Sequence, residues 1–223
     1  MLGEHDGESA RVAAREAEIQ AFKPSPYFEV HATFGVKAGP RSTIRLMEFA
    51  VEDDPAAGVK AGQLLSDRSD SFSGFAFLHD FAITPNWAVF LQNAIAFNPL
   101  PYVAGRKGAA QCLQSQPGGQ AKFWLIPRDG GAFAGQKPRI INAPDGFVFH
   151  HLNAWEEDGE VVVAWQQWIP TQHILSVGYR FSQDHGSTWS ETAVMETPPN
   201  TNMQANARLA ALPAGGFAMT WVS

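Results

Sequence analysis

Short apolar runs with a period of two dominate the chain from residue 27 onward and predict β-strands rather than helices. Turn-forming Gly, Pro, Asp and Asn separate most of these runs, as in APDG at 143–146. Many short strands joined by turns are typical of a propeller, a sandwich or a barrel, so we expect an all-β fold. The expected strands cover about residues 27–36, 42–51, 81–92, 110–115, 121–127, 147–155, 160–168, 174–182, 206–213 and 216–222.

The first 26 residues have a different character from the rest of the chain. The run ESARVAAREAEIQ at 8–20 is rich in Ala, Glu and Arg, and it predicts the one convincing helix. KPSP at 23–26 separates this helix from the first strand pattern. We therefore expect residues 1–26 to be a helical leader.

Composition and charge exclude several classes of protein. Hydrophobic residues make up 45% of the chain and charged residues 17%, which is enough apolar material for a core. The 16 Lys and Arg are scattered and the net charge is −6, so we expect no nucleic-acid partner. The single cysteine, Cys112, excludes an intrachain disulfide and is expected to be a small buried side chain. No secretory-type or membrane-spanning apolar run is present, and a reducing, cytoplasmic setting is expected.

Two histidines follow aromatic-rich apolar runs and precede polar residues. His79 lies in GFAFLHDF at 74–81, and His150 lies in GFVFHHLNAWEEDG at 146–159. Imidazole is a common ligand of iron, zinc and copper. The two are 71 residues apart, so they meet only if the fold brings distant strands together, as the inner strands of a propeller do. The alternative is that both are hydrogen-bonded core histidines.

Four motifs in order resemble those of carotenoid cleavage oxygenases. They are FLHDFAITPNWAVFLQN at 77–93, NPLPYVAGRKGAAQC at 98–112, WLIPRDGG at 124–131 and FHHLNAWEEDG at 149–159. FGVKAGPRSTIRL at 34–46 fits less tightly. The resemblance spans about residues 27–162, and four ordered motifs are a specific signal.

The resemblance implies a seven-bladed propeller with Fe(II) held by four histidines, of which His79 would be the second and His150 the third. His151 would be a neighbour of the site or a core residue. The implied reaction is oxidative cleavage of one C=C bond of a carotenoid or apocarotenoid by O₂, without an organic cofactor. The segment Pro99–Lys107 combines apolar residues with two cations, and in this family the region lies near the tunnel mouth, so peripheral membrane contact is expected there.

Other positions depart from the family pattern. AFKP at 21–24 places Phe22 where the first histidine ligand would lie, and no motif supports His31, His173 or His185 as a substitute. We therefore expect a partial propeller of about three oxygenase-like blades, an incomplete iron site, and weak or absent activity.

The tail resembles a different propeller type. SQDHGSTW at 182–189 fits an Asp-box turn, in which Asp184 and Thr188 bond the turn, Gly186 takes a positive φ and Trp189 packs inside. We divide the chain into residues 1–26, an oxygenase-like segment at 27–162 and an Asp-box-like hairpin or blade at 163–223. A fused or truncated reading frame joined near 159–166 would explain this division. The alternative function is a glycan-binding or sialidase-like module.

Overall fold

The computed structural model describes residues 30–222 except 38, 40, 79, 117–118, 144–146, 170–173, 196–204 and 212–216. The predicted helix at 8–20 lies outside the described residues. The described part is built mainly of antiparallel sheets, so the all-β prediction is confirmed.

Three sheets follow one another along the chain. Sheet I has the order β1 (Val30–Lys37), β2 (Arg41–Ala50), β3 (Leu64–Ser73). Sheet II has the order β4 (Ala82–Ile83), β5 (Trp87–Gln92), β8 (Lys122–Pro127), β9 (Arg139–Asn142). Sheet III has the order β10 (Phe147–Glu157), β11 (Glu160–Ile169), β12 (Ile174–Ser182), β13 (Ala193–Val194).

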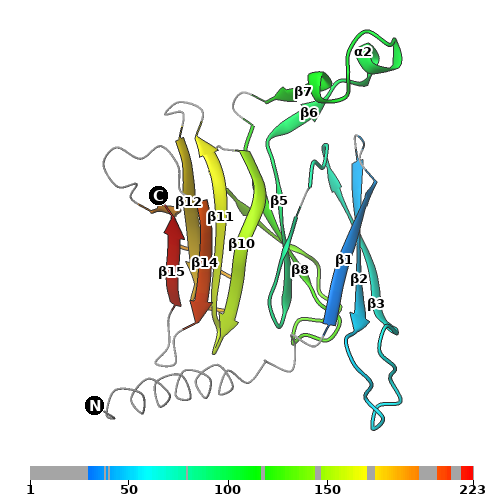
Figure 1. Cartoon of the computed structure of the whole chain (residues 1–223), viewed down its shortest axis with the longest axis vertical. Helices are drawn as coiled ribbons and strands as arrows, with labels where there is room; N and C mark the ends of the chain where they lie inside the picture. Colours follow the sequence, from blue (N-terminus) through cyan, green and yellow to red (C-terminus); the bar gives the residue numbers. More distant parts are fainter. Residues whose placement is uncertain are drawn as a thin grey trace, which may run out of the picture.

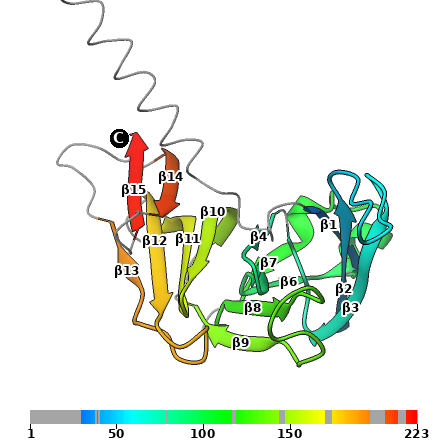
Figure 2. The ribbon, with the colours of Figure 1, turned by 90° about the horizontal axis from the view of Figure 1, so that it is seen from below.

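These sheets are arranged as successive blades of a partial propeller. Figure 1 shows sheets I, II and III side by side, and Figure 2 shows them following one another in an arc. The four-stranded antiparallel sheet is the usual propeller blade. A further hairpin, β14 (Ala205–Ala211) with β15 (Phe217–Val222), packs beside β10 and β11.

Sheet II is buried on both of its faces. Alternate residues of its strands point to opposite faces, so each strand contributes to two cores. One face packs on sheet III and the other on sheet I, and this explains why β5 is apolar at nearly every position. The residues facing sheet III are Trp87, Val89, Leu91, Phe123 and Leu125, and those facing sheet I are Ala88, Phe90, Trp124 and Ile126.

The strand prediction is wrong in two instructive places. β3, with the sequence LLSDRSDSFS, was not predicted because Ser and Asp are depleted in strands, yet it pairs with β2 along its length. The expected strand at 81–92 is two strands, because Thr84, Pro85 and Asn86 form a turn between them. The turn is closed by the Thr84 N–H, which donates to the Trp87 carbonyl at 2.8 Å.

Between β5 and β8 the chain leaves sheet II as an arm, residues 94–116. The arm contains β6 (Ile95–Phe97), α2 (Pro99–Val103), a 3₁₀ turn (Ala110–Cys112) and β7 (Leu113–Ser115). It projects from the upper end of the molecule in Figure 1. None of the helices in the described residues has the length and apolar character needed to cross a membrane.

The turn at 182–189 has the contacts that its sequence predicts. The Asp184 carboxylate accepts hydrogen bonds from the Thr188 N–H at 2.7 Å, the Thr188 hydroxyl at 2.7 Å and the Ser187 N–H at 2.9 Å. These bonds, the Thr188 N–H first among them, lower the pKa of Asp184 to about 2. Gly186 has a φ of 80°, and Trp189 packs against the core between sheets II and III.

The predicted boundary between residues 162 and 163 falls inside β11. Sheet III therefore contains strands from both sides of that boundary. The division of the chain into two parental segments stays a prediction about its origin.

Candidate metal centre and its surroundings

The described segments next to the two predicted ligands are neighbours in the fold. His79 lies outside the described residues, but its neighbours Leu78 and Phe81 pack onto the core between sheets I and II. His150 lies in β10, and its side chain is outside the described set. β10 packs against β4, which begins three residues after His79, so the fold brings the two motifs to adjacent segments.

The ladder between β10 and β11 is irregular where His150 occurs. Val148 pairs with Gln167 and His151 pairs with Trp165, so two residues of β10 stand opposite Gln166 alone. A second irregularity follows between residues 151 and 153. Such bulges break the ladder and re-aim side chains, and they are frequent beside active sites.

Asn93 binds the backbone of β10 close to His150. Its side-chain amide donates to the Val148 carbonyl at 2.9 Å, and its side-chain oxygen accepts from the Val148 N–H at 2.9 Å. Asn93 is only 3% exposed and follows β5 directly. A buried amide with both of its functions bonded acts here as a substitute strand partner.

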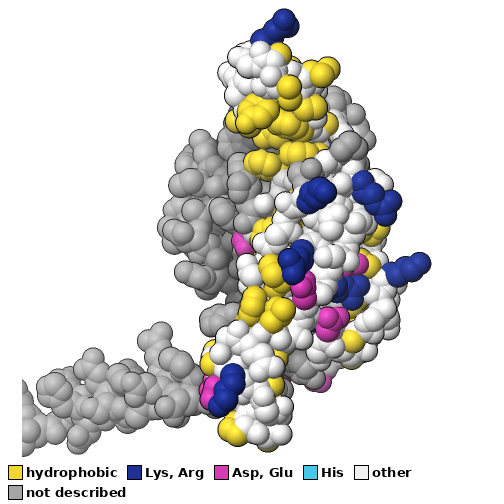
Figure 3. All heavy atoms as spheres, turned by 90° about the vertical axis from the view of Figure 1, so that its right-hand side faces the viewer, with side chains coloured by type: hydrophobic (Ala, Val, Ile, Leu, Met, Phe, Trp, Pro, Cys, Tyr) yellow, Lys and Arg dark blue, Asp and Glu magenta, His cyan; other side chains and the backbone are white. Residues whose placement is uncertain are grey.

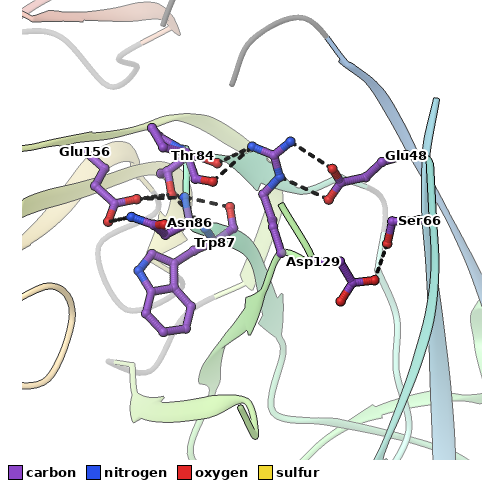
Figure 4. Close-up of polar contacts among 9 residues, drawn as sticks. Glu48, Ser66, Thr84, Asn86, Trp87, Asp129 and Glu156 are labelled. Carbon is purple, nitrogen blue, oxygen red and sulfur yellow. Dashed lines mark hydrogen bonds and ion pairs between the residues drawn. The ribbon is translucent and has the colours of Figure 1, made fainter. Parts of the chain in front are cut away.

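Glu156, near the far end of β10, holds the turn between β4 and β5. Its carboxylate accepts from the Thr84 hydroxyl at 2.7 Å, the Asn86 N–H at 3.1 Å and the Asn86 side-chain amide at 2.8 Å. Figure 4 shows Glu156 pointing at Thr84 and Asn86. One carboxylate thus joins sheet III to sheet II by three hydrogen bonds.

The same turn is held from the opposite side by a buried ion pair. Arg128 donates to both carboxylate oxygens of Glu48 on β2, at 3.0 and 2.8 Å, and the two side chains are 3% and 4% exposed. Arg128 also donates to the Thr84 carbonyl at 2.7 Å and, through its backbone N–H, to the Asn86 carbonyl at 2.9 Å. The turn is therefore the junction of sheets I, II and III (Figure 4).

The remaining histidines and the cysteine have separate surroundings. The His151 ring lies 6.2 Å from the Phe123 ring, consistent with a core neighbour, and His185 lies in the turn after β12 with a φ of 57°. His31 lies in β1, whereas Phe22 and His173 lie outside the described residues. Cys112 is 2% exposed, as predicted for a small buried side chain.

Imidazole is a donor type that Fe(II) accepts, so the residue types of the two histidine motifs suit an iron ion. The segments on which this rests are the bulged strand β10 and its packed neighbour β4. Within the described residues, which omit both of these imidazoles, no cluster of three or more His, Cys, Asp or Glu could hold a metal.

An aromatic ladder connects the segment before His79 to the arm. The Phe75 ring stacks on Phe77 at 6.5 Å and on Phe97 at 5.4 Å, and Phe97 meets Tyr102 edge-on at 6.3 Å. Leu100, Tyr102 and Val103 of α2 are 76%, 52% and 81% exposed. A continuous apolar path thus runs from the histidine motif to an exposed apolar surface, seen at the top of Figure 3.

Sequence reasoning missed the polar residues that hold this region together. The turn chemistry of Thr84-Pro85-Asn86 was a usable signal, because it interrupts an otherwise apolar run. Asn93, Arg128 and Glu156 carry no local signal, since their partners lie 55, 80 and 70–72 residues away in the chain.

Comparison with known proteins identifies the family. The sequence profile of the retinal pigment epithelial membrane protein (RPE65) family matches residues 27–211. The chain is 44% identical over 133 residues to apocarotenoid-15,15'-oxygenase of Synechocystis sp., covering 60% of this chain and 24% of that enzyme. It is 38% identical over 86 residues to carotenoid 9,10(9',10')-cleavage dioxygenase 1 of Phaseolus vulgaris, covering 39% of this chain and 15% of that enzyme.

Solved structures agree with this result. Cobalt-substituted Synechocystis apocarotenoid oxygenase superposes with a TM-score of 0.65 at 30% identity, covering 81% of this chain and 37% of that one. The chain thus spans about a quarter or less of these curated relatives. It belongs to the retinal pigment epithelial membrane protein family, the carotenoid cleavage oxygenases that its histidine motifs resemble.

Proposed function

We propose that this chain is part of an Fe(II)-dependent dioxygenase that cleaves one C=C bond of a carotenoid or apocarotenoid into two carbonyl groups. The observation that carries the proposal is the family match over residues 27–211, which contains both histidine motifs. One relative is named as an apocarotenoid oxygenase and another as a carotenoid cleavage dioxygenase, and a solved structure of the Synechocystis oxygenase is cobalt-substituted.

His79 and His150 are the proposed ligands of this iron. A bound Fe(II) would supply activation of O₂, whose two atoms end in the two carbonyl products. The contribution of the chain is to hold two neutral imidazoles in place and to keep the surroundings dry. Because imidazole is neutral, an all-histidine set leaves the full positive charge on the ion. In the two-histidine, one-carboxylate set of many non-haem oxygenases, the carboxylate neutralises part of that charge.

The aromatic ladder supports a polyene as substrate. A conjugated polyene is flat and apolar, and aromatic faces offer a matching surface without polar groups that would need bonding. Phe75 and Phe77 stack with an angle of 22° between their rings, and Phe75 and Phe97 with 17°. Their proposed role is to orient the chain of the substrate beside the histidine motif and to exclude water.

The arm is the proposed contact with a membrane, from which an apolar substrate would enter. Three apolar side chains of α2 are exposed, and Arg106 and Lys107 follow them in an exposed stretch. Apolar side chains flanked by cations favour an interface with anionic lipid. We propose a cytoplasmic protein that touches membranes peripherally at Pro99–Lys107.

Liposome binding tests this role of the arm. Replacing Leu100 and Tyr102 by Ser should lower partitioning by about tenfold or more, because each apolar side chain buried in lipid contributes roughly 1.5–3 kcal/mol. The matched control replaces the exposed Ile140 and Val194 by Ser, which should leave partitioning unchanged. Equal partitioning of the arm variant and the unchanged protein would disprove the membrane role.

Activity of this chain alone is expected to be weak or absent. Two imidazoles bind Fe(II) less tightly than the four that the family resemblance implies, and the chain covers 24% of the related apocarotenoid-15,15'-oxygenase. Purified protein with Fe(II) and a β-apocarotenal should show little loss of polyene absorbance. A robust loss of polyene absorbance that disappears in His79→Ala would support the proposed reaction and overturn the expected inactivity of this chain.

Metal binding tests the ligands independently of turnover. His79→Ala and His150→Ala should each weaken Fe(II) binding by about tenfold or more under anaerobic conditions. His31→Ala is the control, because no motif supports that strand histidine as a ligand. Affinity that is the same in all three variants would refute the assignment and favour core histidines. The matches reported above give no support to the glycan-binding alternative.

A further inference from the structure

We propose that Asn93 and Glu156 are positioning residues for the metal site. They hold β10, which carries His150, at a fixed register and angle against the β4–β5 hairpin, which follows His79. The inference rests on the proposed function, because it assigns the two residues a role toward the ligands of that site.

The Asn93 clamp lies on the His150 side. Its amide takes both the N–H and the C=O of Val148, two residues before His150. The ladder between β10 and β11 is interrupted at residues 149–150, so this stretch loses support from its strand partner. The bonds from Asn93 hold Val148, the last paired residue before this interruption, from the sheet II side.

The Glu156 clamp lies at the other end of the strand. Its three hydrogen bonds grip the turn at Thr84 and Asn86, which begins five residues after His79. That turn has little freedom of its own, because Arg128 binds the Thr84 and Asn86 carbonyls from the side of sheet I. Glu156 therefore bonds to a fixed point rather than to a flexible loop.

Together the clamps hold β10 at two points on either side of His150. At about 3.3 Å per residue, Val148 lies roughly 7 Å from His150 along the strand and Glu156 roughly 20 Å away. One fixed point would prevent sliding only, whereas two points also prevent tilting of the strand. A metal site needs its ligands held within a few tenths of an ångström, and outer residues that orient ligands change metal affinity by about 10–100-fold.

Cobalt titration of the full chain tests the proposal. Asn93→Ala and Asn93→Asp should raise the Co(II) dissociation constant by about tenfold or more and change the visible Co(II) spectrum. Glu156→Gln should raise the same dissociation constant by about threefold or more. Two exposed neighbours on β10 provide the matched controls. Asn153→Ala and Glu157→Gln remove the same kinds of group and should leave affinity and spectrum unchanged.

A destabilised variant separates positioning from loss of folding. Val163→Ala should lower the melting temperature through a cavity in the core of β11, without changing Co(II) affinity or spectrum in the folded protein. If Val163→Ala and Asn93→Ala weaken Co(II) binding equally, the clamp has no special role and the inference is overturned.

Hydrogen exchange makes the clamp testable even without metal. Asn93→Ala should accelerate amide exchange in residues 147–151 relative to Asn153→Ala, and unchanged exchange there would overturn the clamp. Failure of the unchanged protein to bind Co(II) saturably would instead disprove the proposed ligands. The two failures are therefore distinguishable.

Discussion

The junction around Thr84–Trp87 and the arm at 94–116 invert the usual distribution of polar and apolar groups. In the junction, charged Glu48 and Arg128 are almost fully buried. In the arm, Leu100 and Val103 are 76% and 81% exposed. Both regions depart in opposite directions, within one chain, from the rule that charged groups are exposed and apolar groups are buried.

The contrast separates two roles. Buried polar groups are directional, so the junction fixes three sheets relative to one another, although well-packed apolar groups would give similar stability. Exposed apolar groups add little to the stability of the fold and gain energy only when something covers them. The junction therefore fixes the relative position of the sheets, whereas the arm presents an exposed apolar surface, for which membrane binding is the proposed role.

The largest expected effect comes from breaking the buried ion pair. Arg128→Met should lower the free energy of unfolding by about 3–5 kcal/mol, because it leaves the Glu48 charge buried without its partner. Urea denaturation measures this. Glu48→Leu combined with Arg128→Met should recover much of the loss, and Arg45→Met, at the exposed pair with Asp67, should change stability far less. Equal losses from Arg128→Met and Arg45→Met would contradict the distinction between buried and exposed pairs.

A smaller loss is expected at the centre of the junction. Thr84→Val removes a hydroxyl that donates to Glu156 and accepts from the Trp87 N–H at 3.0 Å. The cost should be about 1–3 kcal/mol, because a buried donor, the Trp87 N–H, and an acceptor, the Glu156 carboxylate, both lose a partner. Thr84→Ser keeps the hydroxyl and should restore most of the stability in the same urea experiment; a serine variant as unstable as the valine variant would indicate lost packing instead.

The turn at 182–189 offers a third case, a polar turn at the surface with many hydrogen bonds. The pKa of Asp184 is lowered from its usual 3.8 to about 2, so its carboxylate stabilises the fold above pH 4. This contribution should disappear as the pH falls from about 4 through about 2. Urea midpoints measured across that range should fall less in Asp184→Asn than in the unchanged protein; parallel curves would contradict the assignment.

The smallest effect on stability is expected in the arm. Leu100→Ser with Tyr102→Ser should leave the melting temperature nearly unchanged, because these side chains are 76% and 52% exposed. The same variant should lose most of its liposome binding. A melting temperature that falls as far as in Thr84→Val would show that the arm is part of the core rather than a binding surface.

The sequence predicted what depends on local pattern. The all-β class followed from short alternating runs, the turn contacts of Asp184 from its local motif, and the family from ordered motifs around His79 and His150. β3 could not be predicted from its own composition, since it is a strand only because β2 pairs with it. The partners of Asn93 and Glu156 also depend on long-range packing, which no local pattern reports.

The separation of the His79 and His150 imidazoles in crystals of anaerobically prepared, Fe(II)-loaded protein tests the central claim most directly. Two ligands of one ion, each about 2.1 Å from it, should have nitrogens about 3–4 Å apart. We predict that separation, with iron between the rings. Imidazoles more than about 10 Å apart, each bonded to its own core partner, would contradict a shared metal site.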